Sequence, residues 1–487
     1  MLTPLSPEAA EQLREFFAAA GYTDRHFRQT PALRELPHWF HDLSRLLEHT
    51  REPSAWNVLL RWFVAGVPQE IEAAAGLVPE PFLALMIGCG MLAREGGQIS
   101  STVMLIPCDD FLFAADPAEH IRSGGAENTV LWPNPTTRLL QQFSVRTPCQ
   151  AMLDLGTGCG IQGILAAGYS RHVVATDLNP RAEQFVRFNA WLNGVEGIEC
   201  LTGDTFQPVE GRTFDLILAN PPFFVTPTSG QMYCENSMDL DGYCRRVVRE
   251  APLYLNEGGY FQAVLEWVEL SGQPWQERLS EWLEGSGCDA WIMRGYFLDP
   301  PAYAEQRIRS TWPAERSGGR FREWMEYYRQ RGVTAIHGGM LAMRKRAGQN
   351  WLRIEELGMD ITQPFGGEVL EAFATQDILS THPSDEELLP MRPRLSPKAL
   401  LEQQSRASEG RWAPASLTLR LTTGLPASLP VESEVAEFLA RCDGTSTLRA
   451  LTDDLAAHVS AYPDQVRQQC CRVIRRLAER RFVQLLR

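Results

Sequence analysis

The sequence lacks any apolar run of the roughly 18 residues that a membrane-spanning helix requires, so no membrane partner is expected. Its 11 cysteines form no Cys-x-x-Cys pair, and we expect reduced thiols that serve as small apolar side chains. Acids come early at the N-terminus and no basic flank precedes an apolar core, so no secretory signal is predicted. A cytoplasmic location is the expectation.

Basic residues are also in short supply. Lys and Arg number 46 against 60 Asp and Glu, a formal net charge of −14. A protein that coats nucleic acid non-specifically needs clustered Lys and Arg, so that class is not expected, although a local basic groove stays open. With 487 residues, the chain predicts about three domains of roughly 150 residues each.

Residues 1–120 have a mainly helical pattern. Ser6 before Pro7 is typical of a helix N-cap, and short helical segments lead to a β-hairpin that turns at Gly96-Gly97. This order predicts a winged-helix-like domain. Its segment 82–90 is apolar rather than basic, which favours docking or substrate selection over the recognition of nucleic acid.

Residues 125–345 alternate apolar strands with helical segments, the pattern of a Rossmann-like, doubly wound α/β sheet. We predict a seven-stranded catalytic domain with these strands: 151–155, 172–176, 198–201, 214–219, 260–265, 291–297 and 340–344.

The C-terminal part is less regular. Residues 346–415 are predicted to be an extension and linker, because 382–414 is rich in Pro, Ser and charge. Residues 416–487 predict a small winged-helix-like domain that resembles peptide-binding domains beside peptide-modifying enzymes. Its last helix carries several arginines, for which we expect a solvated face, with a contact to RNA or an acidic protein as the alternative.

No metal site is predicted. His38 and His41 could share a metal across one helical turn, but the sequence shows no third ligand nearby, and a half-buried structural pair is the simpler interpretation. For Asp109-Asp110 an acidic turn is likewise simpler than a metal site.

A glycine-rich turn follows the first predicted strand. Asp154 precedes Gly156, Gly158 and Gly160, which allow a tight turn. Backbone N–H groups and the next helix N-terminus can then approach a ligand closely. This stretch predicts a nucleotide-cofactor site.

Two cofactors are consistent with that turn. Residues 158–163 satisfy Gly-x-Gly-x-x-Gly and Asp177 lies about 20 residues further on, so an NAD-dependent oxidoreductase is one alternative. Asp154 favours S-adenosylmethionine, because its carboxylate can meet the methionine amino group but would repel a pyrophosphate. Asp204 is placed for the adenine amine, and Asp177 for the ribose hydroxyls.

Asn220-Pro221-Pro222-Phe223 follows the fourth strand and indicates the acceptor. An amide or aromatic amine is a poor nucleophile because its lone pair is delocalised. The Asn220 side-chain oxygen and the Pro221 carbonyl can accept both N–H bonds of one NH2 group and aim its lone pair at the methyl. The prolines hold the carbonyl rigidly, and Phe223 offers a face for a planar group.

Residues 130–225 resemble class I S-adenosylmethionine-dependent methyltransferases that act on the glutamine side chain of release factors. The resemblance rests on WPNPTTRLL at 132–140, DLGTGCG at 154–160, DLNPRAEQFVRFNA at 177–190 and FDLILANPPF at 214–223. It implies Asn220, Pro221, Pro222 and Phe223 as the catalytic residues. The cofactor contacts that it implies are Asp154, Gly156, Gly158, Asp177 and Asp204. We also predict cofactor contacts at Thr157, Gly160, Leu178, Thr205 and Asn220.

Phe223 departs from this family, which usually has Tyr there. Phe is common in related enzymes that methylate exocyclic amines of guanine or adenine in RNA. The sequence therefore predicts an N-methyltransferase for a planar nitrogen of a protein or peptide, with an RNA base as the alternative acceptor. A binding protein that has lost catalysis is a further class, and the intact Asn-Pro-Pro-Phe speaks against it.

Overall fold

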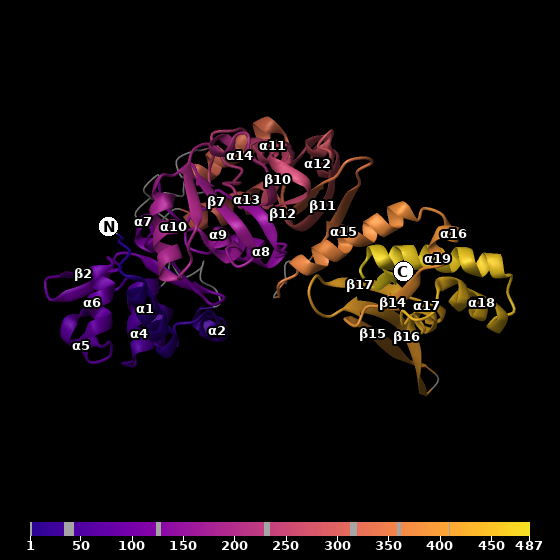
Figure 1. The fold of residues 1–487 in the computed structure, drawn as a ribbon, viewed down its shortest axis with the longest axis horizontal. Helices are drawn as coiled ribbons and strands as arrows, with labels where there is room; N and C mark the ends of the chain where they lie inside the picture. The colour runs from indigo at the N-terminus through magenta and orange to yellow at the C-terminus, as the bar shows by residue number, and fades with distance from the viewer. Residues whose placement is uncertain are drawn as a thin grey trace. The chain divides into compact units, whose positions relative to one another are not determined.

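The computed structural model describes residues 2–33, 43–122, 128–227, 234–311, 319–357, 361, 363–408 and 410–487. The chain divides into two compact units. The first comprises Met1–Gln141 and Arg146–Glu356, and the second comprises Gln142–Val145 and Leu357–Arg487. Each is described by itself below, with the element labels of Figure 1.

The first unit begins with short helices and a small antiparallel sheet of order β1-β3-β2. Ser6 caps the first helix, its Oγ accepting from the Ala9 N–H at 3.3 Å. Gly96 and Gly97 both have positive φ at the turn between β2 and β3, which confirms the predicted hairpin. The elements are α1 (Pro7–Ala19), α2 (Asp24–Gln29), η1 (Pro31–Leu33), α3 (Ser44–His49), α4 (Ala55–Leu60), η3 (Arg61–Ala65), β1 (Gln69–Glu70), α5 (Ile71–Ala75), α6 (Glu80–Gly88), β2 (Leu92–Glu95) and β3 (Gln98–Ser101).

A second hairpin and two helices lead into the large sheet. Strands β4 (Met104–Cys108) and β5 (Phe111–Ala115) pair antiparallel. Asp109, at their turn, has φ of 51°, so the acidic pair forms the turn that the sequence predicts. Helices α7 (Ala118–Arg122) and α8 (Pro135–Phe143) follow. His38 and His41 lie outside the described residues.

Among the described residues, the large sheet has eight strands in the order β13-β11-β12-β10-β9-β6-β7-β8. Apolar residues fill the interiors of its central strands, which is why the sequence pattern located seven of them. The strands are β6 (Cys149–Leu155), β7 (Ser170–Asp177), β8 (Ile198–Thr202), β9 (Phe214–Ala219), β10 (Leu255–Leu270), β11 (Cys288–Leu298), β12 (Val333–Lys345) and β13 (Leu352–Glu356).

The prediction of seven strands was wrong by one. Strand β13 adds to the edge of the sheet, parallel to β11. Its sequence is polar and half exposed, so it lacks the buried apolar run that marked the others. Strand β12 runs antiparallel to both β10 and β11, and the sheet is therefore mixed.

Helices connect and cover these strands. Helix α9 (Ile161–Ala166) packs against β6 and β7, and α10 (Arg181–Leu192) packs against β5 and β8 (Figure 1). The other helical elements of this unit are η4 (Gln207–Val209), α11 (Gly242–Glu250), η5 (Ala251–Tyr254), α12 (Trp275–Leu283), α13 (Pro300–Thr311) and α14 (Arg320–Arg331).

Strands β6, β7, β8 and β9 run parallel, so their C-terminal ends meet at one edge of the sheet. The register pairs Leu155 with Thr176 on one side and with Ala219 on the other, and it pairs Asp177 with Thr202. In open α/β sheets this edge is where ligands bind. The four predicted ligand-bearing segments are thereby brought together.

The second unit holds α15 (Gly366–Thr381), α16 (Asp385–Leu388), β14 (Arg392–Leu395), β15 (Ala399–Ser408), β16 (Arg411–Leu421), β17 (Ala427–Val431), α17 (Ser433–Ala440), α18 (Leu448–His458), α19 (Pro463–Glu479) and β18 (Val483–Leu486). Strands β15, β16 and β17 form one antiparallel sheet, and β14 pairs with β18.

The prediction of a linker over 382–414 was wrong. This stretch contains α16, β14, β15 and the start of β16. Ser384 and Glu387 form a capping box at α16. Strand β15 and the first part of β16 are polar and largely exposed, so their sequence lacks the apolar alternation expected of a half-buried sheet, which appears only at Leu417, Leu419 and Leu421. The two winged-helix-like assignments remain predictions.

Among the described residues, no helix combines the length and the apolar character that crossing a bilayer demands.

Candidate active site

The turn after β6 is shaped by its glycines. Gly156, Gly158 and Gly160 have φ of 72°, 54° and 88°, values that side chains rarely allow. A Cβ at Gly156 or Gly158 would meet no atom within 4 Å, whereas at Gly160 it would lie 3.0 Å from Val186. The first two glycines therefore leave open space before the turn, and the third lets α10 pack closely.

Asp154 stabilises this turn through two hydrogen bonds. Its Oδ2 accepts from the Thr157 hydroxyl at 2.7 Å and from the Gly163 N–H at 2.9 Å. The side chain is buried, and burial raises the pKa of this carboxyl to about 6. Its charge at neutral pH thus has a real desolvation cost, which a cation nearby would offset.

Asp177 ends β7 and faces the same turn. Its two carboxylate oxygens accept from the Gly158 N–H and the Asn179 N–H, both at 2.8 Å. Burial raises its pKa, although these hydrogen bonds oppose the shift. Leu178, the next residue, is 53% exposed. An exposed leucine beside a half-buried carboxylate offers an apolar surface for a flat ring.

Asp204 and Thr205 follow β8. Burial would raise the pKa of Asp204, but hydrogen bonds from Thr205 and Arg246 outweigh it and lower the pKa. Arg246 Nη1 lies 2.9 Å from Asp204 Oδ2. Thr205 has φ of 50°, and its hydroxyl also contacts Tyr243 Oη at 3.1 Å. Sequence reasoning missed Tyr243 and Arg246, because only the fold brings α11 against this turn.

Asn220 presents one unsatisfied atom. Its Nδ2 donates to the hydroxyls of Thr136 and Thr137 at 3.4 and 3.3 Å. Its Oδ1 is buried and has no hydrogen-bond partner among the residues that the structure describes. Buried polar atoms without partners are rare and costly, so this oxygen is placed to accept from a ligand.

The Pro221 and Pro222 carbonyls differ in their surroundings. Pro222 O accepts from Asn236 Nδ2 at 2.9 Å. No hydrogen bond from the described part of the chain reaches Pro221 O. Asn220 Oδ1 and Pro221 O, adjacent at the end of β9, are thus both open to N–H donors.

Phe223 is only 8% exposed, with its ring 5.7 Å from that of Phe224. Most of its surface is therefore already covered by the chain. Its role in stacking a planar acceptor remains a prediction.

A buried polar network anchors the residues after Phe223. The Arg307 guanidinium lies 4.3 Å from the Phe224 ring centroid. Tyr303 Oη accepts from the Val225 N–H, and Tyr328 Oη donates to the Val225 carbonyl. This network could not be located from the sequence, since its members lie 78 and 103 residues from Val225.

Glu266 on β10 is the charge at the centre of that network. The carboxylate, 1% exposed, accepts from Tyr303 Oη at 2.5 Å and also pairs with Arg307 and Tyr296. Fully enclosed charges of this kind are stable only when paired and hydrogen-bonded.

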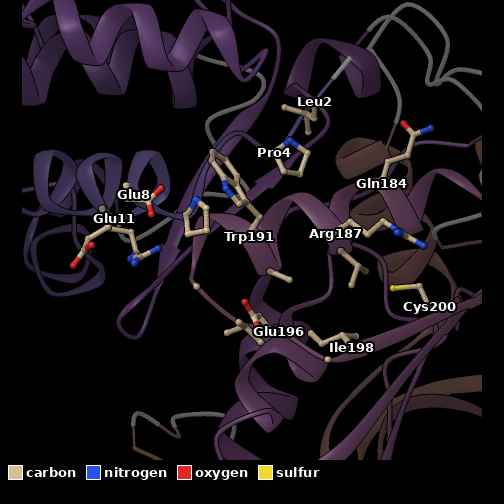
Figure 2. Close-up of a pocket in the computed structure, with 17 residues that line it drawn as sticks. Leu2, Pro4, Glu8, Glu11, Gln184, Arg187, Trp191, Glu196, Ile198 and Cys200 are labelled. Atoms are coloured by element: carbon tan, nitrogen blue, oxygen red, sulfur yellow. The ribbon is translucent and has the colours of Figure 1, made fainter.

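A cavity of about 820 Å³ lies elsewhere in the first unit. Figure 2 shows that its walls come from α1, α10 and the start of β8, including Glu8, Arg187 and Trp191. None of the predicted site residues lines it. The strand-end edge, with its open turn and unpartnered acceptor, is therefore the candidate active site.

Two family models match the chain. Residues 134–268 match the methyltransferase small domain, and residues 370–484 match a domain of unknown function (DUF7782). The release factor glutamine methyltransferase of Cereibacter sphaeroides is 34% identical over 142 residues, covering 26% of this chain and 50% of that protein.

Two further relatives differ in their named substrates. A Methanocaldococcus jannaschii protein named "putative protein N5-glutamine methyltransferase" is 33% identical over 137 residues, covering 27% of this chain and 68% of the relative. The ribosomal RNA small subunit methyltransferase C of Alcanivorax borkumensis is 29% identical over 108 residues, covering 22% of this chain and 30% of that protein. The chain thus spans about half the length of the Cereibacter relative and less of the Alcanivorax relative.

The mixed sheet and its glycine turn define an α/β protein with a nucleotide-type ligand site at the strand ends. The chain belongs to the class I S-adenosylmethionine-dependent methyltransferases. The resemblance seen in the sequence is confirmed, and S-adenosylmethionine, not NAD, is the cofactor of this class.

The residues present fit that cofactor. The space before Gly156 and Gly158 admits a ligand that approaches the backbone closely. Asp154 supplies negative charge beside the turn, Asp177 a carboxylate at the second strand end, and Leu178 an exposed apolar side chain. When bound, S-adenosylmethionine supplies an electrophilic methyl group.

Proposed function

We propose that this protein methylates a planar N–H nitrogen, with the side-chain amide of a protein glutamine as the preferred acceptor. The observation that carries the proposal is the buried, unpartnered Oδ1 of Asn220. An acceptor oxygen in that state favours a substrate that brings an N–H group to it.

Asn220 and Pro221 then act as a clamp on one NH2 group. Each of their oxygens accepts one N–H bond, which orients the nitrogen lone pair and draws the nitrogen toward tetrahedral geometry. The acceleration of methyl transfer then comes from positioning of the nitrogen and from hydrogen bonds that strengthen in the transition state. The nitrogen would form its new bond to the methyl carbon as the bond from that carbon to the cofactor sulfur breaks to leave a thioether, and the nitrogen would release one proton to water.

The cofactor roles follow the strand ends. We assign Asp154 to the amino group of S-adenosylmethionine, Asp177 to the ribose hydroxyls and Asp204 with Thr205 to the adenine. Gly156, Thr157, Gly158, Gly160 and Leu178 form the surface against which the cofactor lies.

Two observations support a protein acceptor. Two of the relatives described above are named as glutamine methyltransferases, and the net charge of −14 is unfavourable for a general RNA-binding surface. An exocyclic amine of an RNA base is the second candidate, favoured by Phe223 and by the ribosomal RNA methyltransferase relative. In either case we assign the winged-helix-like flanking segments to substrate selection.

Replacement of Asn220 tests the clamp. In Asn220→Ala, methyl incorporation from tritiated S-adenosylmethionine into cell extract should fall at least about a hundredfold, because the nitrogen is no longer oriented. Calorimetry should show cofactor affinity within a few-fold of wild type. Asn236→Ala, which removes the contact to the Pro222 carbonyl, is the matched control and should retain most activity. Wild-type turnover in Asn220→Ala would remove the clamp.

A further inference from the structure

Asn220 can serve as a clamp only if its amide is turned the right way. The two orientations of an asparagine side chain exchange an acceptor oxygen for a donor NH2 group. With Oδ1 toward the substrate, the site takes an N–H donor. With Nδ2 toward the substrate, it would instead favour a carbonyl or a ring nitrogen.

A chain of hydrogen bonds sets this orientation, and it starts at a group of unambiguous polarity. The Thr137 backbone N–H, in the first turn of α8, can only donate, and it lies 2.9 Å from Asn134 Oδ1. Asn134 must therefore present its oxygen to the start of the helix, as helix-capping asparagines do.

That oxygen also receives both threonine hydroxyls. Thr136 Oγ1 lies 2.8 Å and Thr137 Oγ1 3.0 Å from Asn134 Oδ1. Because a carbonyl oxygen can only accept, both hydroxyls donate to it. Each hydroxyl has one proton, so each has only lone pairs left for any further partner.

Asn220 is that further partner. Facing two acceptors at 3.4 and 3.3 Å, it must present its NH2 group to them. The opposite flip would set its oxygen against two oxygens that have no proton to share. Asn220 Oδ1 is thereby turned away, as the buried unpartnered atom of the site.

We propose that Asn134, Thr136 and Thr137 are positioning residues that lock the flip state of Asn220, and so restrict the acceptor to N–H donors. The inference deepens the proposed function and rests on it. Gln162 connects these three residues to the helix that follows the glycine turn, because its Nε2 donates to the Thr137 carbonyl at 3.0 Å. One short segment at the start of α8 thus contacts both halves of the site.

The Thr136→Val/Thr137→Val double variant removes both hydroxyls with little change of shape. Thr136→Ser/Thr137→Ser keeps them and is the matched control. With selective ¹⁵N-asparagine labelling, the Asn220 side-chain NH2 signal is assigned by its loss in Asn220→Asp. The Asn220 NH2 protons should exchange slowly in the wild type and in the serine variant. In the valine variant their exchange should be at least about tenfold faster.

Turnover gives the second readout. In the valine variant, the rate of label transfer to extract at saturating S-adenosylmethionine should fall about tenfold, while cofactor affinity stays within about twofold. The serine variant should stay within about twofold of wild type in both. Unchanged Asn220 exchange in the valine variant, or an equal rate loss in the valine and serine variants, would overturn the proposal.

A pair of substitutions at Asn134 keeps the test decisive if the valine variant does not fold. Asn134→Asp retains an oxygen that accepts from all three donors and should preserve the Asn220 signal. Asn134→Ala removes the acceptor of both threonine hydroxyls. The Asn220 NH2 group should then lose its protection from hydrogen exchange. If wild-type protein transfers no label, the proposed function fails, yet the amide signals still decide the flip state separately.

Discussion

Asp154 stabilises the glycine turn and is also the residue that we assign to the amino group of the cofactor. One of its oxygens, Oδ2, is used twice to hold the glycine turn, at Thr157 and Gly163. Burial makes its charge costly, and raises its pKa to about 6. A cofactor ammonium group near this carboxylate would offset that cost.

Cofactor affinity should therefore depend on pH through Asp154. Below pH 6 the free protein holds this carboxyl protonated, and ligand binding must expel the proton. Calorimetric affinity for S-adenosylmethionine should fall by up to about tenfold per pH unit from pH 6 downward, and should be flat from pH 7 to 8.

Asp154→Asn is the control for that titration, because its amide oxygen can still accept from Thr157 and Gly163. It should bind the cofactor more weakly than wild type at pH 7.5 and show little change down to pH 5. A wild-type affinity that is constant from pH 7.5 to 5 would contradict the assignment.

The loop that carries Asn-Pro-Pro-Phe is stabilised by residues of β10, α13 and α14. Glu266 and Arg307 form a buried pair, and the Arg307 guanidinium lies over the Phe224 ring. The backbone of Val225 is fixed at both its N–H and its carbonyl by tyrosine hydroxyls. The chain just after the motif is thus fixed by residues that lie outside the motif.

Glu266→Gln should destabilise the first unit by about 3–5 kcal/mol, since it leaves the Arg307 charge buried without a counter-charge. Urea unfolding followed by tryptophan fluorescence measures this loss. Glu269→Gln, on the same strand, is the control.

Glu269 contacts His337, and burial lowers the pKa of His337 to about 4. The Glu269–His337 contact is therefore not an ion pair near pH 7, and its loss should cost less than about 1 kcal/mol. Equal losses in the two variants would contradict the network.

At the scale of elements, most of strands β6 to β12 could be located from the sequence because they carry buried apolar runs, although β8 is only partly buried. The motif residues could be located because turn chemistry is local. Strand β13, strand β15 and the first part of β16 are polar and largely exposed, so periodicity missed them. The Thr136–Asn220 contact spans 84 residues and the Glu266–Arg307 pair spans 41. Such pairings follow from strand order, which no local pattern encodes.

For the whole molecule, the open question is the acceptor. The arginines of α19, one argument for RNA, are partly engaged inside the second unit. Arg467 pairs with Asp453 and Asp464, and Arg475 donates to the His382 and Ser384 carbonyls. Combined with the net charge of −14, this favours a protein acceptor.

The atom that receives the methyl group can be identified from a labelled product. The 487-residue chain is incubated with extract and S-adenosylmethionine labelled in its methyl group, and the product is then divided between RNase and protease. We predict that the label survives RNase, is released as small peptides by protease, and is found by mass spectrometry on a glutamine side-chain nitrogen. Label lost to RNase would contradict the protein acceptor, and label on oxygen or carbon would contradict methylation of an N–H nitrogen altogether.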